Sequence, residues 1–255
     1  MLLALDVGNT TVTMGAFQDH ALKATWRFAT DVGRFPDEYG VLMLNLLEHE
    51  QLSPEDISEA VMACVVPDLE PTFQRICERY FNVRPLGVHA GVKTGLRILY
   101  DTPRDVGADR VADAVAATQL YGPPLIVVDL GTGTVFDAID ANGDYVGGAI
   151  APGLGIASEA LFRRAAKLYR VELSTPRAAI GRNTITAMQS GILFGYVGLI
   201  EGIVARMKKE IGENAKVIGT GGYADNIAKE TDVIDVVNQD LTLQGLRMIY
   251  DMNRS

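Results

Sequence analysis

Two aspartates, each placed where a short apolar segment ends, are the residues of this chain best suited to chemistry. Residues 2–12 read LLALDVGNTTV and residues 125–135 read LIVVDLGTGTV, so Asp6 and Asp129 occupy the same place in two copies of one pattern, 123 residues apart. A carboxylate at a strand end can hold a hydrated cation, and the glycine turn after it can bring backbone N–H groups close to phosphate oxygens. Two such turns facing each other would hold a nucleoside triphosphate and its metal ion.

The repeat extends beyond the two aspartates. At the same offset, Gly8 matches Gly131, Thr11 matches Thr134 and Val12 matches Val135. A hairpin closed by an Asx-type turn at Asn9 would explain the first copy by itself. That simpler interpretation requires neither Asp6 nor the second copy, so we favour a phosphate-binding role.

A third group of polar residues lies at the start of a predicted helix over residues 105–120. Asp105, Asp109 and Asp113 all lie near the start of this helix, and Asp113 is four residues beyond Asp109 on the same helical face. One of them could act as a general base, or they could simply favour the positive helix N-terminus, with Arg110 forming a surface ion pair. The residue pattern alone leaves these alternatives open.

The elements that must position these residues follow one order twice. Apolar alternation and breakers predict strands at 2–6, 10–17 and 22–28, then a helix at 36–51, a strand at 60–66, a helix at 67–81, a strand at 83–88 and the helix at 105–120. After the breaker at 121–124, strands at 125–130, 133–139 and 145–150 repeat the opening order. They are followed by a helix to about 166, a loop-rich segment at 167–183, a helix at 184–211, a strand at 216–219, a helix from 222, a strand at 233–236 and a last helix from 240.

This order predicts a duplicated α/β architecture of two lobes, residues 1–117 and 118–255, with a nucleotide cleft between them. The long helix after Thr184 is apolar around much of its circumference between Ile192 and Ile203. One buried face would not account for that composition, so we expect the helix to form a dimer interface.

Composition narrows the class of protein. The chain has 255 residues, 48% of them hydrophobic, and a net charge of −9, which argues against nucleic-acid binding. Its two cysteines and three histidines form no metal-binding or catalytic-triad spacing. Neither a signal peptide nor a membrane span is predicted, and we expect a cytoplasmic protein with reduced thiols.

Several motifs together resemble one family. Asp6-Val-Gly-Asn-Thr-Thr, Asp129-Leu-Gly-Thr-Gly-Thr and Thr220-Gly-Gly-Tyr-Ala resemble the two phosphate motifs and the adenosine motif of the actin/hexokinase superfamily. Gly107-Ala-Asp-Arg, Gly147-Gly-Ala-Ile-Ala-Pro-Gly and Gly181-Arg-Asn-Thr narrow the resemblance to type III pantothenate kinases. The resemblance implies a ribonuclease H-like, actin-like ATPase fold. It also implies a homodimeric enzyme that phosphorylates pantothenate with ATP in the first step of coenzyme A synthesis.

The resemblance also implies roles for individual residues. Asp109 would be the catalytic base, and Arg110 would bind the pantothenate carboxylate through its two-point fork. Asp6 would orient Mg²⁺ through water, and Asp129 would help to hold a monovalent cation, K⁺ or NH₄⁺. The ATP contacts would be Asp6, Val7, Gly8, Asn9, Thr10, Thr11, Val12, Thr13 and Thr132, with the Gly219–Gly222 turn against the adenosine, and the pantothenate contacts would be Tyr100, Gly107, Ala108, Asp109, Arg110 and Thr184.

Two of these residues also have simpler interpretations. Thr184 is typical of an N-cap or first-turn residue of the long helix, and its substrate contact could be made across a dimer interface. Tyr100 could be a half-buried loop aromatic. For the whole chain, the alternatives are another kinase or phosphatase of the superfamily, such as a sugar or acetate kinase, and a non-catalytic, actin-like ATP-binding accessory protein.

Overall fold

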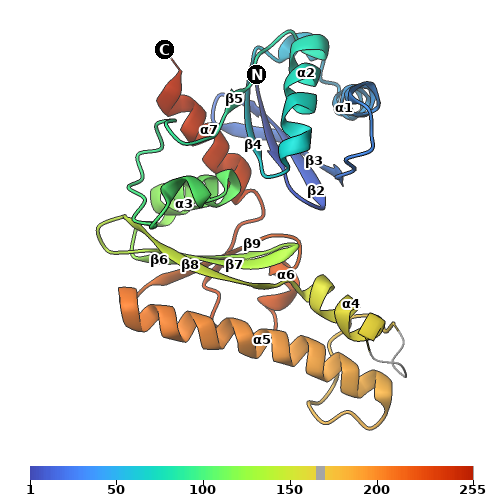
Figure 1. Cartoon of the computed structure of the whole chain (residues 1–255), viewed down its shortest axis with the longest axis vertical. Helices are drawn as coiled ribbons and strands as arrows, with labels where there is room; N and C mark the ends of the chain where they lie inside the picture. The colour runs from blue at the N-terminus through green and yellow to red at the C-terminus, as the bar shows by residue number, and fades with distance from the viewer. Residues whose placement is uncertain (165–169, 255) are drawn as a thin grey trace. The chain divides into compact units, whose positions relative to one another are not determined.

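The chain forms two compact units. The computed structural model describes residues 1–164 and 170–254. Unit 1 contains Met1–Leu96, Tyr100–Gln119 and the C-terminal segment from Asp240, and unit 2 contains Arg97–Leu99 and Leu120–Gln239. Each unit is built around one five-stranded mixed sheet with helices packed on it (Figure 1).

The sheet of unit 1 has the strand order β3-β2-β1-β4-β5. Its strands are β1 (Leu2–Val7), β2 (Thr11–Gln18), β3 (Ala21–Ala29), β4 (Glu59–Cys64) and β5 (Leu86–Gly87). The first three strands form an antiparallel meander, whereas β4 runs parallel to β1 and β5 runs parallel to β4. The carboxyl ends of the two central strands therefore lie at the same edge of the sheet.

Helices cover both faces of this sheet. The side chains of Leu3, Leu5 and Met14 pack in one core with α1 (Pro36–His49) and α2 (Glu70–Tyr80). The C-terminal helix α7 (Leu241–Asn253) packs against β1, β2 and β4, with Leu243 against Gly15. Because successive strand residues point to opposite faces, β1, which is apolar except for Asp6, serves two cores at once.

The last helix therefore belongs with the first sheet. The expected division after residue 117 grouped residues 240–254 with the second half of the chain, whereas the structure packs α7 in unit 1. Leu241, Leu243, Leu246 and Ile249 are all buried there. The helix also lies so close to α3 (Ala108–Tyr121) that a Cβ on Gly245 would overlap the Ala112 carbonyl. Helical periodicity identifies an apolar face but not the sheet that it covers.

Unit 2 repeats the topology of unit 1, with the strand order β10-β9-β6-β7-β8. Its strands are β6 (Leu125–Leu130), β7 (Gly133–Ile139), β8 (Tyr145–Pro152), β9 (Lys216–Thr220) and β10 (Val236–Val237), and its helices are α4 (Leu154–Arg164), α5 (Thr184–Ile211) and α6 (Ala224–Ile227). The strands β6, β7 and β8 form the antiparallel meander, and β9 runs parallel to β6. The duplicated α/β architecture predicted from the sequence is therefore confirmed.

The long helix α5 lies against one face of this second sheet (Figure 1). Its side chains Leu193, Val197 and Ile200 pack in one core with strand residues such as Ile126 and Val128. In length and composition α5 is the one helix, among the residues described, that could cross a membrane. Its row of core side chains covers the sheet, so this side of α5 is a packing face within the unit.

The two hairpins that carry the repeated motif differ in length by one residue. Val7 lies opposite Val12 in the first sheet, whereas the equivalent Leu130 lies opposite Thr134 in the second. The constant sequence offset therefore matches Asp6 with Asp129 correctly but is wrong by one residue in the following strand. The reason is that the second turn is shorter, so Thr134 takes the register position of Val12.

Several predicted elements are shorter in the structure. The strand expected at 83–88 is reduced to β5, the helix expected from 222 is the single turn α6, and the strand expected at 233–236 is β10. The helices expected at 67–81 and 105–120 each begin with a separate 3-10 turn, at Pro67–Leu69 and Pro103–Asp105. The predicted helix end near 166 and the start of the loop-rich segment lie outside the described residues.

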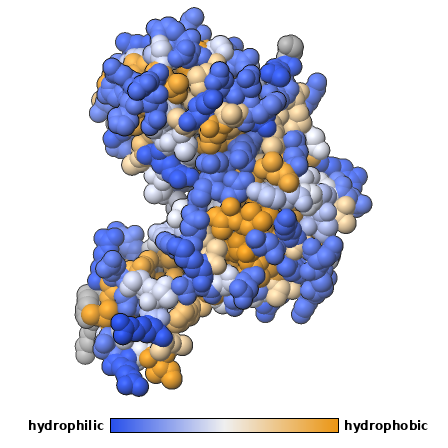
Figure 2. Space-filling view, turned by 180° about the vertical axis from the view of Figure 1, so that it is seen from behind, coloured by the Kyte–Doolittle hydropathy of each residue, from blue (hydrophilic) through white to orange (hydrophobic). Residues whose placement is uncertain are grey.

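Most of the surface is hydrophilic, with apolar side chains gathered in a few patches on the face seen in Figure 2. The exposed apolar residues come from both units. They are Val32, Phe35, Val41, Leu99, Leu120, Ile150, Ile156, Leu161, Ile180 and Ile185.

Candidate active site

The first repeated motif forms a short turn between β1 and β2. The Gly8 N–H group donates to the Thr11 carbonyl at 3.1 Å, which closes the turn. Asn9 and Thr10 are exposed at its tip, and Asp6 is half-buried at the end of β1. The turn thus presents exposed backbone and hydroxyl groups beside a carboxylate, which is the arrangement that a phosphate and its hydrated cation require.

The start of α3 lies beside this turn, within the same unit. The Val65 N–H group, just past β4, donates to the Val7 carbonyl at 3.0 Å. A Cβ built on Gly107 would lie 3.7 Å from Cγ1 of Val65. The structure therefore brings the Asp6–Thr13 segment and the Gly107–Arg110 segment together, although a hundred residues separate them in sequence.

Asp109 lies in the first turn of α3. A Cβ on Gly107 would overlap its Oδ1 atom, so only glycine leaves room for this carboxylate. The backbone N–H of Arg110 donates to Oδ1 at 2.8 Å. Burial raises the pKa of Asp109 above its ordinary value, and this effect outweighs the lowering by the backbone N–H and the guanidinium of Arg110. A raised pKa brings a carboxylate closer to the range in which it accepts a proton efficiently.

The other two carboxylates of this helix start are placed differently. Asp105 is exposed in the 3-10 turn that precedes α3. Asp113 is only 3% exposed, one turn deeper in the helix. Asp109 alone combines partial access with partial desolvation, which favours it over both neighbours for acid–base chemistry.

Tyr100 is half-buried in the loop before α3 and belongs to unit 1. The three residues before it belong to unit 2, where the Leu99 N–H donates to the Tyr145 carbonyl at 2.8 Å and the Arg97 guanidinium pairs with Asp144. Backbone and ionic contacts thus hold the three residues before Tyr100 in unit 2.

The second repeated motif forms the turn Gly131–Thr132 in unit 2. The carboxylate of Asp129 lies between two glycines: Oδ1 is 3.4 Å from the Cβ position of Gly131, and a Cβ on Gly221 would overlap it. Gly221 has φ of +88°, a conformation that favours glycine. The predicted adenosine turn at 219–222 is thus packed directly against Asp129.

The chain before α4 closes the other side of this turn. A Cβ on Gly153 would overlap the carbonyl oxygens of Gly131 and Thr132. Behind the turn, the fully buried Thr134 hydroxyl lies 2.6 Å from the Tyr196 hydroxyl. Burial raises the pKa of Tyr196 to about 12. These contacts make the second turn a rigid cradle with Thr132 exposed at its tip.

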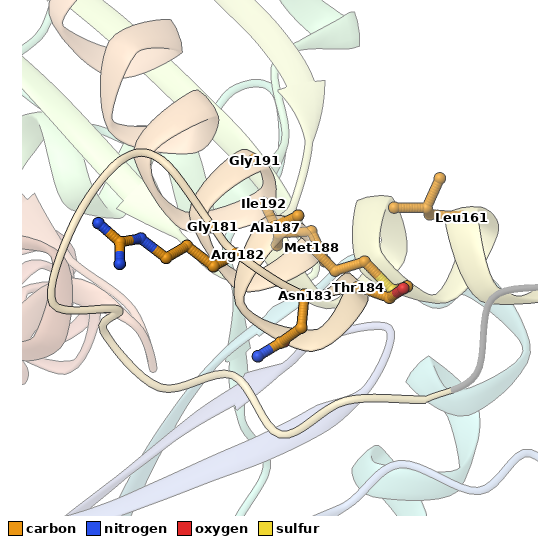
Figure 3. A pocket seen from close by; sticks show the side chains of 9 residues that line it. All are labelled: Leu161, Gly181, Arg182, Asn183, Thr184, Ala187, Met188, Gly191 and Ile192. Atoms are coloured by element: carbon orange, nitrogen blue, oxygen red, sulfur yellow. The ribbon is translucent and has the colours of Figure 1, made fainter.

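Thr184 is the first residue of α5. The N-cap is Asn183, whose side-chain oxygen accepts from the Thr186 N–H at 2.9 Å, so the first-turn alternative for Thr184 is confirmed. Thr184 lines a pocket of about 570 Å³ between α4 and the start of α5. Figure 3 shows Thr184 and Met188 facing Leu161, while the Arg182 side chain extends away from it.

Neither motif supplies a complete metal site by itself. Among the residues described, no three histidine, cysteine, aspartate or glutamate side chains are grouped closely enough to hold a metal ion. A cation bound beside Asp6 or Asp129 would therefore take its remaining oxygen ligands from backbone carbonyls, from water or from phosphate groups.

Comparison with known proteins identifies the family. Residues 2–206 match the family model described as type III pantothenate kinase. A type III pantothenate kinase of Roseiflexus sp. (strain RS-1) is 52% identical over the whole length of both chains. The chain belongs to the type III pantothenate kinase family. The enzyme class expected from the sequence, an ATP-dependent kinase that phosphorylates pantothenate for coenzyme A synthesis, is thereby confirmed.

Solved structures confirm the fold of this type III pantothenate kinase. A Campylobacter jejuni protein assigned to the Baf family of transcriptional activators covers 98% of both chains with a TM-score of 0.63 at 18% identity. A second structure is the activator of 2-hydroxyisocaproyl-CoA dehydratase from Clostridium difficile with bound ADPNP. The match covers 99% of this chain and 94% of the activator, with a TM-score of 0.54 at 14% identity. At these identities the likeness establishes the actin-like ATPase fold alone.

Sequence reasoning missed the residues that support the two turns of this pantothenate kinase. Gly153 lies inside the Gly147–Gly153 motif, and that motif was the one signal that could have pointed to its place beside the second turn. Thr30 and Tyr196 lie outside every motif, and only the tertiary structure brings them to the turns.

The desolvation of Asp109 predicts an unusual effect on stability. Its pKa is raised in the folded protein, so the folded state binds this proton more tightly than the unfolded chain does. The free energy of unfolding therefore falls as pH rises through that pKa, and it is lowest where Asp109 is ionised. Asp109→Asn removes the buried charge and should leave the free energy of unfolding at pH 7 no lower than that of the wild type.

The measurement is denaturant unfolding at several pH values between 4 and 8. The exposed Asp105→Asn variant is the control and should keep the wild-type profile. A clear loss of stability at pH 7 in Asp109→Asn alone would show that the ionised carboxylate stabilises the fold.

Proposed function

We propose that Asp109 is the general base of the pantothenate kinase reaction in this chain. It takes the proton of the primary hydroxyl of pantothenate as that oxygen forms a bond to the γ-phosphorus of ATP, and the bond to the β-phosphate oxygen breaks to release ADP. The observation that carries this proposal is the position of Asp109 at the start of α3, beside the end of β1. In-line transfer needs a base close to the phosphate-binding turn, and the neighbouring positions of these two elements support the proposal.

The remaining residues hold the two substrates. The turn over Asp6–Thr13 binds phosphate oxygens of ATP through backbone N–H groups and hydroxyls, and Thr132 contacts ATP from the second turn. Arg110 holds the pantothenate carboxylate, which fixes the substrate next to the base. Tyr100, Gly107 and Ala108 line the same site, and Thr184 contributes from α5.

Two cations fit the carboxylates of the turns. Asp6 is half-buried beside an exposed turn, where it can orient the water shell of Mg²⁺. Asp129 lies in the glycine cradle of Gly131 and Gly221, where a K⁺ or NH₄⁺ ion would find carboxylate and backbone oxygens. Bound cations would offset the negative charge of the phosphates.

We further propose that the enzyme is a cytoplasmic homodimer formed through α5. Only seven of its 28 residues are buried within one chain. Gly191, Gly195 and Gly198 lie on the exposed side, and a Cβ on any of them would meet nothing within 4 Å. Such a flat stripe allows a second helix to approach closely. A dimer through α5 would also place the pocket at Thr184 near the partner chain.

The catalytic proposal is tested by Asp109→Asn in a coupled ADP-release assay. The variant keeps the shape of the side chain but loses the proton acceptor, so kcat should fall by roughly 10²–10⁴. ATP binding should change little. Asp105→Asn is the control and should keep near-wild-type kcat, and Asp113→Asn should lose stability rather than kcat because Asp113 is buried. If Asp109→Asn retained most of its kcat, the helix-dipole role of Asp109 would replace the proposal.

The cation proposal predicts a dependence on the monovalent ion. Activity should require Mg²⁺ and should rise several-fold when K⁺ or NH₄⁺ replaces Na⁺ at constant ionic strength. Asp129→Ala should lose most of the activity together with this dependence, whereas Asp232→Ala, which removes an exposed carboxylate of the same unit, should keep both. Equal rates in Na⁺ and K⁺ for the wild type would argue against the role of Asp129.

The dimer proposal predicts the effect of a charge on the glycine stripe. Gly195→Glu improves helix propensity but places a carboxylate on the exposed side of α5, so it should convert a dimer into a monomer in light scattering coupled to size exclusion. Asn226→Glu adds the same charge to the exposed side of α6 and should remain dimeric. A wild-type monomer with full activity at nanomolar concentration would contradict the proposal.

A further inference from the structure

Thr30 makes two hydrogen bonds to the turn that follows β1. It stands directly after the last residue of β3, and no motif includes it. Its hydroxyl donates to the Gly8 carbonyl at 2.7 Å, and its backbone N–H donates to the Thr10 carbonyl at 3.0 Å. One residue thus holds the carbonyl oxygens on both sides of Asn9.

These two bonds determine which way the peptide units of the turn face. In a trans peptide the C=O and N–H groups point in opposite directions. Because the Gly8 and Thr10 carbonyls point toward Thr30, the N–H groups of Asn9 and Thr11 point away from it. Thr30 therefore aims two N–H donors of the turn toward the side on which an anion would bind.

Thr30 is itself held by a buried aromatic residue. The Tyr39 hydroxyl accepts from the Asp31 N–H at 2.7 Å and donates to the Asp31 carbonyl at 3.1 Å. The Tyr39 side chain is fully buried, with its ring 5.0 Å from that of Phe73 and 5.9 Å from that of Phe28. The backbone next to Thr30 is therefore anchored in the core between β3 and α1.

We propose that Thr30 is a positioning residue for ATP. It orders the Gly8–Thr10 turn before the nucleotide arrives, so that binding does not have to order the turn. The proposal rests on the proposed role of this turn in holding ATP phosphates. Thr30 itself need not touch the nucleotide, and the pantothenate site on α3 should not depend on its hydroxyl.

The test compares Thr30→Val, which keeps the shape but removes the hydroxyl, with Thr30→Ser, which keeps the hydroxyl. Thr30→Val should raise the KM for ATP about tenfold, the scale of one hydrogen bond. The KM for pantothenate should change less than twofold. Thr30→Ser should restore most of the ATP affinity. Thr25→Val, an exposed threonine on the same strand, is the matched control and should behave as the wild type.

Binding of ATP with Mg²⁺ in the absence of pantothenate separates this proposal from the proposed function. Thermal shift or calorimetry should show weaker ATP binding in Thr30→Val than in Thr30→Ser, even if pantothenate were not the acceptor. Unchanged ATP binding in Thr30→Val would overturn the role of Thr30 and leave the kinase reaction intact. An equal loss in Val and Ser variants would also overturn it, because the hydroxyl would then not be the cause.

Tyr39→Phe provides a second test if Thr30→Val does not fold. It removes the hydroxyl that anchors Asp31 but keeps the buried ring. It should raise the KM for ATP in the same direction by a smaller factor, with the KM for pantothenate unchanged. An unchanged KM for ATP in a folded Tyr39→Phe variant would contradict the anchoring step.

Discussion

The parallel pairing of β1 with β4 is the constraint on which the site in unit 1 depends. Both strands end at the same edge of the sheet, so the turn after Val7 and the segment after Cys64 must lie side by side. The Val65 N–H group donates a hydrogen bond to the Val7 carbonyl at this edge, and Gly107, at the start of α3, lies next to the Val65 side chain. A phosphate turn and a candidate base thereby come together although each lies on a different element.

Glycines stand where other segments approach the carboxylates of Asp109 and Asp129. At the edge of each sheet the backbone of one turn packs directly on the carboxylate or carbonyl groups of another segment. Gly107 leaves room for the Asp109 carboxylate, and Gly221 leaves room for that of Asp129. A side chain at either position would displace the neighbouring carboxylate. Glycine is therefore required here by close approach rather than by flexibility.

Partial burial gives the site its chemical character and has a cost in stability. Burial of Asp109 raises the pKa of its carboxyl group, and the Arg110 N–H and guanidinium oppose that rise. In unit 2 the buried Thr134–Tyr196 pair supports the turn through a neutral hydrogen bond, and burial raises the pKa of Tyr196 to about 12. The charged group, Asp109, is thus partly accessible, whereas the buried Thr134–Tyr196 hydrogen bond behind the second turn is neutral.

The sequence by itself determined the duplicated strand order, the helix of Asp109 and the family, because these follow from local periodicity and from motifs of adjacent residues. It did not determine which sheet α7 covers or the register beyond the second turn. These depend on packing between segments far apart in the chain, which apolar periodicity leaves open. Thr30 shows the limit most clearly, since its hydrogen bonds to Gly8 and Thr10 exist only because β3 returns beside the turn. Local sequence encodes which residues could bind a phosphate, and the tertiary fold decides which way their N–H groups face.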